Sequence, residues 1–96
     1  MTDRTLTIRR ADASDSTALV RLAALDSASP PTGEALLAEV GEELWAALEL
    51  ESGTAIADPF HPTADLVDLL HLRASLIGGE DRRERSLRAR LLPRAA

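Results

Sequence analysis

The chain contains no cysteine and no lysine, and each absence excludes a class of chemistry. Without cysteine there are no disulfides, no thiolate nucleophile and no cysteine-based metal site. Without lysine there is no Schiff base and no Walker-type phosphate loop, which requires Gly-Lys-Ser/Thr. No apolar run approaches the roughly 20 residues that cross a membrane, and "MTDRTLTIRR" lacks the apolar stretch of a signal peptide. We therefore expect a soluble, cytoplasmic protein with no membrane contact.

Aromatic and β-branched residues are also scarce, and this limits the core. The chain of 96 residues is 45% hydrophobic, but that fraction rests on 17 Leu and 17 Ala, with one Phe, one Trp and no Tyr. The length suits one small domain. Domains of this size bury only about 60–65% of their chain surface, and alanine buries little. A thin core that gains stability from a partner surface is expected.

Charge is distributed unevenly along the chain. Residues 1–79 carry 5 Arg against 13 acidic residues, a net charge of −8, whereas residues 80–96 carry 6 Arg against 3 acidic residues, a net charge of +3. The acidic body argues against nucleic-acid binding over most of the surface. The Arg-rich extension has two interpretations: it binds an acidic partner or nucleic acid, or it solubilises the chain or folds against an acidic body. Nucleic acid is the less favoured partner.

The first half of the chain predicts one helix among short strands. "TLTIRRAD" alternates, with Leu6 and Ile8 on one face of a half-buried strand. A helix from about Ser14 to Ala28 follows, with Asp12 placed to cap its first turn. The runs "EALLAEV", "ELWAALEL" and "TAIADPF" are separated by glycine-containing turns, which favours a three-stranded antiparallel meander.

The second half predicts a second helix that opens at Pro62-Thr63 and ends at Gly78-Gly79. Beyond the glycines, a short charged helix and a frayed tail fit equally well. The fold class is therefore α+β: a four-stranded, mostly antiparallel sheet in the order strand-helix-strand-strand-strand-helix, with a helix on each face. Residues 1–77 form the domain and residues 78–96 an extension. Five residues are expected to form the buried stripe of the second helix: Leu66, Leu69, Leu70, Leu76 and Ile77.

This order of elements resembles the first half of the GNAT acetyltransferases. "TIRRADASDSTALVRLAALD" is similar to that family's opening strand and first helix. "ALLAEVGEELWAALEL" is similar to its second and third strands, and "TAIADPF" to its fourth strand, which often ends in proline. The resemblance covers roughly residues 5–77. It implies the α+β fold given above and, for a complete member of the family, binding of acyl-CoA.

The one specific motif of the GNAT family follows the fourth strand, and this sequence departs from it. An Arg or Gln and two spaced glycines there turn backbone N–H groups toward the pyrophosphate of acetyl-CoA. Matching the strand-end proline to Pro59 puts Pro62, Asp65 and Val67 at those three positions. Proline has no N–H to donate, and a carboxylate repels phosphate. The resemblance therefore implies a truncated GNAT-like protein that lacks the pyrophosphate loop, and we expect no cofactor.

Several polar residues form patterns that resemble sites. Asp68, His71 and Ser75 share one helical face like a catalytic relay, but a relay needs an exposed nucleophile at a strained turn and oxyanion donors. We interpret these three as a solvated face. His61 and His71 stand ten residues apart without an H-x-x-x-H pair, so both are expected to be ordinary polar residues. Trp45 is expected to pack in the core or an interface.

The acidic residues of the meander are interpreted as solvated strand edges and turns. Asp58, at the end of the fourth strand, is not assigned the role of the general base that GNAT enzymes often carry on that strand. We therefore expect no catalytic, cofactor-binding or metal-ligating residue. The acidic residues concerned are Glu39, Glu42, Glu43, Glu49 and Glu51.

Three hypotheses for function follow. The first is a non-catalytic interaction module that forms a homodimer through the open edge of "TAIA" or through the leucines of the second helix. The second is an acyl-CoA-dependent acetyltransferase with an atypical or dimer-completed site. The third is an accessory factor whose basic extension binds an acidic protein or nucleic acid. The first, which is not an enzyme, is favoured because the GNAT phosphate-binding residues are replaced.

Overall fold

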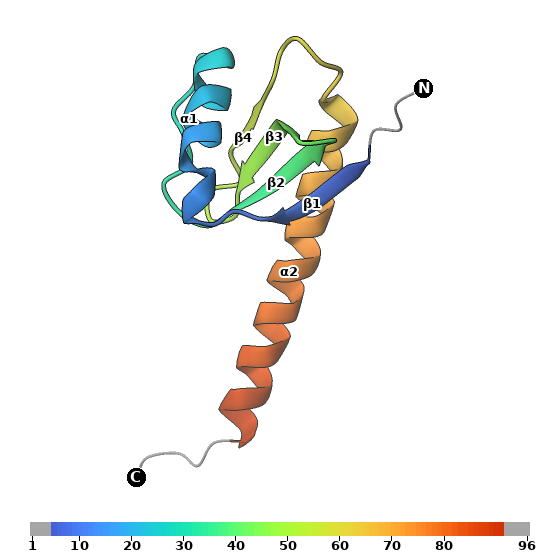
Figure 1. The fold of residues 1–96 in the computed structure, drawn as a ribbon. Helices are drawn as coiled ribbons and strands as arrows, with labels where there is room; N and C mark the ends of the chain where they lie inside the picture. Colours follow the sequence, from blue (N-terminus) through green and yellow to red (C-terminus); the bar gives the residue numbers. More distant parts are fainter. Residues whose placement is uncertain (1–4, 92–96) are drawn as a thin grey trace.

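The fold is a four-stranded antiparallel sheet with two helices, and the computed structural model describes residues 5–91 (Figure 1). The strands lie side by side in chain order, each antiparallel to its neighbour. The predicted α+β class and order of elements are confirmed. The elements are β1 (Leu6–Arg10), a 3₁₀ turn η1 (Ala13–Asp15), α1 (Ser16–Leu25), β2 (Ala35–Val40), β3 (Glu43–Glu49), β4 (Ala55–Ala57) and α2 (Ala64–Leu91).

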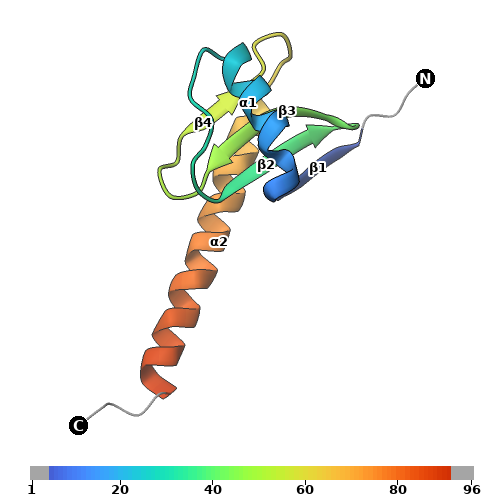
Figure 2. The ribbon, with the colours of Figure 1, turned by 60° about the vertical axis from the view of Figure 1, so that its left-hand side comes forward.

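The two helices cover opposite faces of the sheet, as expected (Figure 2). Successive strand residues point to opposite faces, so β2 and β3 contribute to both cores and read as continuous apolar runs. Leu36 faces α2 and Leu37 faces α1. The core under α1 contains Leu19, Leu22, Ala23, Leu37, Ala47 and Ile56. The core under α2 contains Leu36, Ala38, Ala46, Leu48 and Leu70.

The first helical segment opens as the 3₁₀ turn η1, which Asp12 caps, so α1 itself begins at Ser16, two residues after the predicted start, and its end also differs from the prediction. Asp12 and Asp15 form a capping box, in which the Asp12 carboxylate accepts from the N–H of Ser14 and the Asp15 carboxylate accepts from the N–H of Asp12. The helix ends at Leu25 and not at Ala28 because Ser27 takes a left-handed φ of 52°. The N–H of Ala28 then bonds to the carbonyl of Ala23 in a Schellman-type turn.

The predicted end of the second helix at Gly78-Gly79 is wrong. Helix α2 continues through both glycines to Leu91, a length of about 42 Å at 1.5 Å per residue. Among the glycines, only Gly41 and Gly53 have a positive φ, so Gly78 and Gly79 keep the right-handed helical conformation. The last turns project beyond the sheet (Figure 1), and the predicted boundary after residue 77 falls inside a continuous helix. No helix within the described range is both long and apolar enough to span a bilayer.

The buried stripe of α2 also differs from the prediction. Leu66, Leu70 and Ile77 face the sheet as expected, and Val67 and Ala74 join them. Leu69 and Leu76 are exposed instead, because each lies about 100° or more around the helix from the line of contact through Leu70. The side of α2 away from the sheet therefore carries apolar side chains. In β1, Ile8 packs toward the core but Leu6 is exposed at the edge of the sheet.

Candidate functional site

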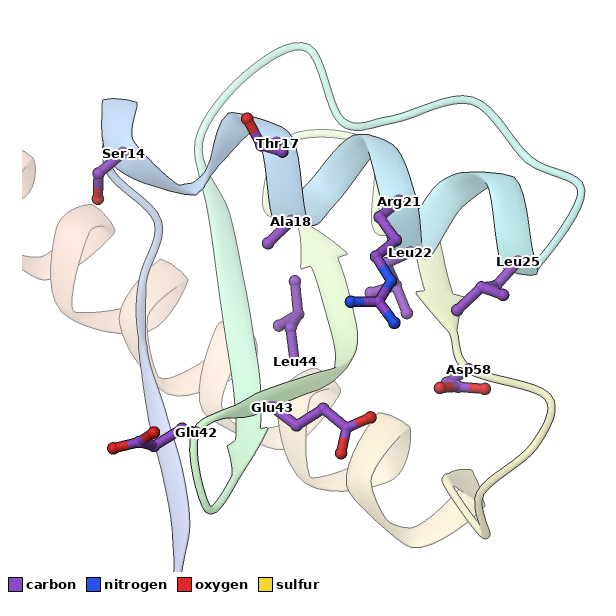
Figure 3. A pocket seen from close by; sticks show the side chains of 10 residues that line it. All are labelled: Ser14, Thr17, Ala18, Arg21, Leu22, Leu25, Glu42, Glu43, Leu44 and Asp58. Carbon is purple, nitrogen blue, oxygen red and sulfur yellow. The ribbon is translucent and has the colours of Figure 1, made fainter.

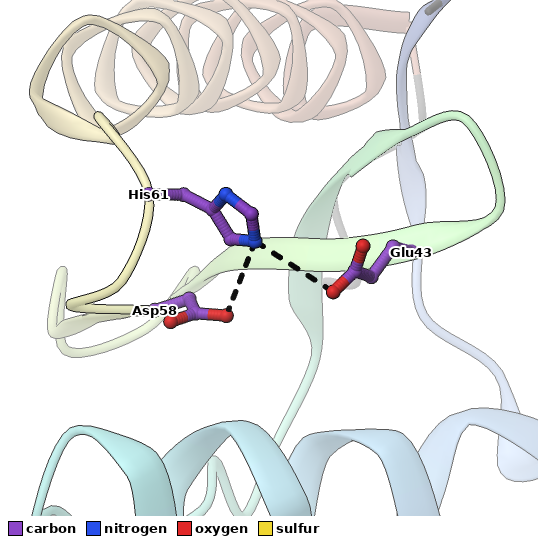
Figure 4. A group of neighbouring side chains, drawn as sticks. All are labelled: Glu43, Asp58 and His61. Carbon is purple, nitrogen blue, oxygen red and sulfur yellow. Dashed lines mark ion pairs between the residues drawn. The ribbon is translucent and has the colours of Figure 1, made fainter.

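Three side chains, one from the start of β3 and two from the loop after β4, converge at one end of the sheet (Figure 4). Glu43 begins β3, Asp58 follows β4, and His61 lies in the loop before α2. Nε2 of His61 is 3.7 Å from Oε1 of Glu43 and 3.8 Å from Oδ2 of Asp58. One donor atom of each residue lies within 4.8 Å of the other two. We call these three residues the Glu-Asp-His cluster.

Asp58 is held by several hydrogen bonds at the end of the edge strand β4. Its N–H donates to the carbonyl of Trp45 at 2.8 Å, which extends the β3–β4 pairing by one residue. Its Oδ1 accepts from the N–H of Phe60 at 2.8 Å, and its carbonyl accepts from the N–H of His61 at 3.3 Å. The side chain is only 8% exposed. Asp58 therefore shapes the turn that carries His61, and its second oxygen, Oδ2, faces His61.

The imidazole of His61 is oriented by Trp45. The two rings are stacked, with centroids 3.8 Å apart and planes inclined by 9°. The prediction that Trp45 packs in the core is confirmed, because the residue is buried in the middle of β3. Stacking on the indole limits rotation of the imidazole, so Nε2 is presented to the two carboxylates.

A cavity of about 380 Å³ opens beside the cluster, between α1 and the ends of β3 and β4 (Figure 3). Glu43 and Asp58 line it, and Arg21 of α1 points into it from the opposite wall. The lining contains three carboxylates and one guanidinium, so it is net negative and favours a cationic occupant. The other lining residues are Ser14, Thr17, Ala18, Leu22, Leu25, Glu42 and Leu44.

A second group of charged residues, around Arg9, stabilises the fold. Arg9 of β1 lies between Asp15 and Glu39, with its Nη2 2.7 Å from Oδ1 of Asp15 and its Nε 2.7 Å from Oε1 of Glu39. The hydrogen bond from Arg9, together with the N–H of Asp12, lowers the pKa of Asp15 to about 2. Hydrogen bonds to Asp15 and then Glu39 raise the pKa of Arg9 above its usual range. These residues join β1, β2 and the start of α1, and are not free to react.

Two of the acidic residues interpreted as solvated have partners in the fold. Glu39 pairs with Arg9, as described above. Glu49 accepts from the hydroxyl of Ser52 at 2.6 Å and from the N–H of Thr32 at 2.8 Å. The Ser52 hydroxyl and then the Thr32 N–H lower the pKa of Glu49. Both residues act in loop and strand packing, whereas Glu42 and Glu43 are the members of the group that line the cavity.

The other patterns found in the sequence do not form sites. Asp68, His71 and Ser75 are all exposed on α2, in agreement with a solvated face. At the corner where a GNAT enzyme holds pyrophosphate, Val67 packs into the core under α2, and Asp65 is exposed in the first turn. A carboxylate at that position occupies the positive end of the helix dipole, the place where helix N-termini bind anions such as phosphate.

No protein family, no curated protein and no solved structure matches this chain. The resemblance to the GNAT family therefore stays a prediction.

Sequence reasoning did not find the Glu-Asp-His cluster. Its members are 15 and 3 residues apart along the chain, come from β3 and the loop between β4 and α2, and match no ligand-spacing pattern. Only the pairing of β3 with β4, which puts Trp45 beside Asp58, brings them together. A usable signal was the "DPFH" turn, because an aspartate before proline tends to bond its own backbone two residues on and hold the turn.

Proposed function

We propose that this protein is a non-catalytic interaction module that forms a homodimer through the exposed face of α2. One observation carries the proposal: Leu69, Leu72 and Leu76 lie exposed on one side of a helix whose opposite side already packs on the sheet. Leu72 and Leu76 are 58% and 57% exposed. We call these three residues the leucine face. Apolar side chains clustered on one exposed helix face mark an interaction surface.

The alternative dimer contact, the open edge of β4, is less suited to pairing. The strand has only three residues, Ala55–Ala57. The N–H of Ala57 already donates to Oδ2 of Asp26 at 3.1 Å, so a second strand would have to displace that bond. Short, blocked edges are a usual protection against strand pairing. The leucine face is therefore the better contact for a second copy.

Charge on the same side of α2 favours an antiparallel arrangement of two copies. Asp65 and Arg83 are both exposed and stand 18 residues apart, which is five helical turns, so they lie on the same side as Leu72 and Leu76. The midpoint of Asp65 and Arg83 along the helix is also the midpoint of Leu72 and Leu76. In an antiparallel pair centred there, Leu72 packs on the second copy's Leu76, and Asp65 meets the second copy's Arg83.

Sedimentation velocity of the full chain, from low to high micromolar concentration, tests the proposal. Three partly exposed leucines per copy make a small contact, so we expect a weak dimer that forms as concentration rises. The L72E/L76E double variant should stay monomeric throughout. V20E is the matched control, because Val20 is equally exposed on α1 and should leave the dimer intact. A clean monomer of the unmodified chain at high micromolar concentration contradicts the proposal.

A second candidate function rests on the projecting end of α2. The C-terminal part of α2 projects beyond the sheet (Figure 1). The last ten described positions of this helix include four exposed arginines, Arg82, Arg83, Arg85 and Arg88. Such a segment suits an acidic protein partner, with nucleic acid the less favoured target because residues 1–79 are strongly acidic. Deletion of residues 80–96 should abolish a salt-sensitive interaction with poly-glutamate. Unchanged binding by the deleted chain contradicts this candidate.

No side chain in the described loop before α2 supports the acyltransferase alternative, which can be tested directly by acyl-CoA binding. Calorimetric titration with acetyl-CoA and longer acyl-CoAs should show no heat if the module is non-catalytic. Binding of an acyl-CoA of any acyl-chain length would favour the GNAT-like activity over the interaction module. Cytoplasmic location belongs to the same proposal and rests on the sequence alone.

A further inference from the structure

We propose that the Glu-Asp-His cluster binds a divalent transition-metal ion, with Zn²⁺ as the best match, at the edge of the cavity under α1. The donors are Nε2 of His61, Oδ2 of Asp58 and Oε1 of Glu43. One imidazole and two carboxylates form a ligand set that zinc accepts, with water in a fourth position. This inference is independent of the dimer proposed above.

The distances within the cluster favour a shared ion over direct contacts. The two N···O separations, 3.7 Å and 3.8 Å, are too long for hydrogen bonds. Two ligands on a tetrahedral zinc, each about 2.1 Å from the ion, lie about 3.4 Å apart. The two N···O separations are thus a few tenths of an ångström longer than in a zinc site, and the three donor atoms all lie within 4.8 Å of one another. Glu43, which is half-exposed, has the freedom to close that gap.

The burial of Asp58 gives a second, independent reason to propose a bound metal ion. Its side chain is more than nine-tenths buried, and Oδ1 is occupied by the N–H of Phe60. No hydrogen bond reaches Oδ2 from any residue in the described part of the chain, and this oxygen faces Nε2 of His61 (Figure 4). Asp58 is a largely buried carboxylate whose Oδ2 opens toward His61 and the cavity, and a charge buried in this way is costly unless a cation offsets it. An ion between Asp58 and His61 would neutralise this charge.

The surroundings of the cluster are those of a supported metal site. Trp45 holds the imidazole by stacking, and the backbone of Phe60 holds the carboxylate of Asp58. Such outer contacts orient ligands and raise metal affinity. The cavity beside the cluster gives the ion and its water access to solvent. Arg21 is the one cationic side chain of the lining, and the three lining carboxylates outnumber it.

Calorimetric titration of the full chain, free of any histidine tag, with Zn²⁺ tests the site, and Mg²⁺ serves as the comparison ion. We expect one Zn²⁺ per chain and much weaker binding of Mg²⁺, which prefers all-oxygen sites. H61A and E43Q should each weaken Zn²⁺ binding by more than tenfold, because loss of supporting contacts alone costs 10–100-fold in many metal sites. E43Q changes an exposed side chain, so its result does not depend on the folding of a variant with a buried change.

H71A is the matched control, since His71 is the only other histidine and is exposed on α2. It should leave the affinity within about twofold. Fluorescence of Trp45, the only tryptophan, provides a second readout and should change on Zn²⁺ addition in H71A but not in H61A. No saturable binding, or an equal loss in H71A and H61A, overturns the proposal. The cluster would then be an imidazole paired with two carboxylates.

Discussion

Arg9 of β1 forms a two-pronged ion pair with Asp15 at the start of α1, with Nη1 2.9 Å from Oδ2 and Nη2 2.7 Å from Oδ1. Planar, paired contacts of this kind are the strongest form of the Arg–carboxylate interaction. Asp15 also completes the capping box with Asp12. A single carboxylate therefore connects the first strand, the helix cap and, through Arg9, Glu39 of β2.

The pKa of Asp15 predicts loss of stability in acid. Because folding lowers this pKa from 3.8 to about 2, the ionised carboxylate stabilises the fold fully above pH 4. That contribution, about 2 kcal/mol, is lost as pH falls from 4 to 2. Urea unfolding of the native chain and of D15N, followed by Trp45 fluorescence, should show a difference that shrinks over this interval. D68N, at an exposed position on α2, should show no such difference.

The leucines of α2 predict a contrast between two neighbouring positions. Leu70 is fully buried under the sheet, whereas Leu72 is exposed on the leucine face. L70A should lower the free energy of unfolding by about 2–5 kcal/mol, because it leaves a cavity in a thin core. L72A should change it by less than about 0.5 kcal/mol. Both are measured at low concentration, where the chain is monomeric; equal effects would contradict the observed orientation of α2.

The two glycines inside α2 predict a stabilising substitution. Gly78 and Gly79 have helical backbones, and an added methyl group would meet no atom within 4 Å. G78A and G79A should each stabilise the helix by about 0.5–1 kcal/mol and strengthen the circular dichroism at 222 nm. G41A is the contrasting control: its φ of +67° in the β2–β3 turn makes alanine destabilising. Lower helicity in G78A would indicate that α2 breaks at this point.

The proposed antiparallel dimer predicts that two single charge reversals weaken dimerisation and that their combination restores it. D65R alone places two arginines opposite each other in the proposed contact, and R83D alone places two aspartates opposite each other. Each should weaken dimerisation, measured by sedimentation velocity in low salt, by several-fold because like charges repel. The D65R/R83D double variant should recover the affinity of the native chain. Failure of the double variant to recover would exclude the antiparallel register.

The stack of His61 on Trp45 predicts a change in the tryptophan environment without any metal. His61 covers one face of the indole. H61A should therefore increase quenching of Trp45 fluorescence by acrylamide, since water and solutes reach the uncovered face. H71A should leave quenching unchanged. No increase in H61A would mean that other side chains shield the indole.

The local elements were predictable because each depends on nearby residues. Asp12 and Asp15 mark the start of the first helix three residues apart, and Gly41 and Gly53 mark turns that need a positive φ. The end of the first helix was misplaced because a serine, Ser27, takes the left-handed position where glycine is usual. The end of the second was misplaced because glycine permits a helix break without requiring one.

The sequence by itself determined the order of the elements, the antiparallel meander and the placement of a helix on each face. These follow from short-range patterns of apolar and turn residues. Only the tertiary structure decided which leucines of α2 are buried and that Glu43, Asp58 and His61 meet. Both depend on how the elements pack. Residues of an α-helix are spaced by 100° around its axis, so the leucines that the sheet does not cover are exposed. The pairing of β3 with β4 brings Glu43 close to Asp58 and His61, although no sequence motif links these residues.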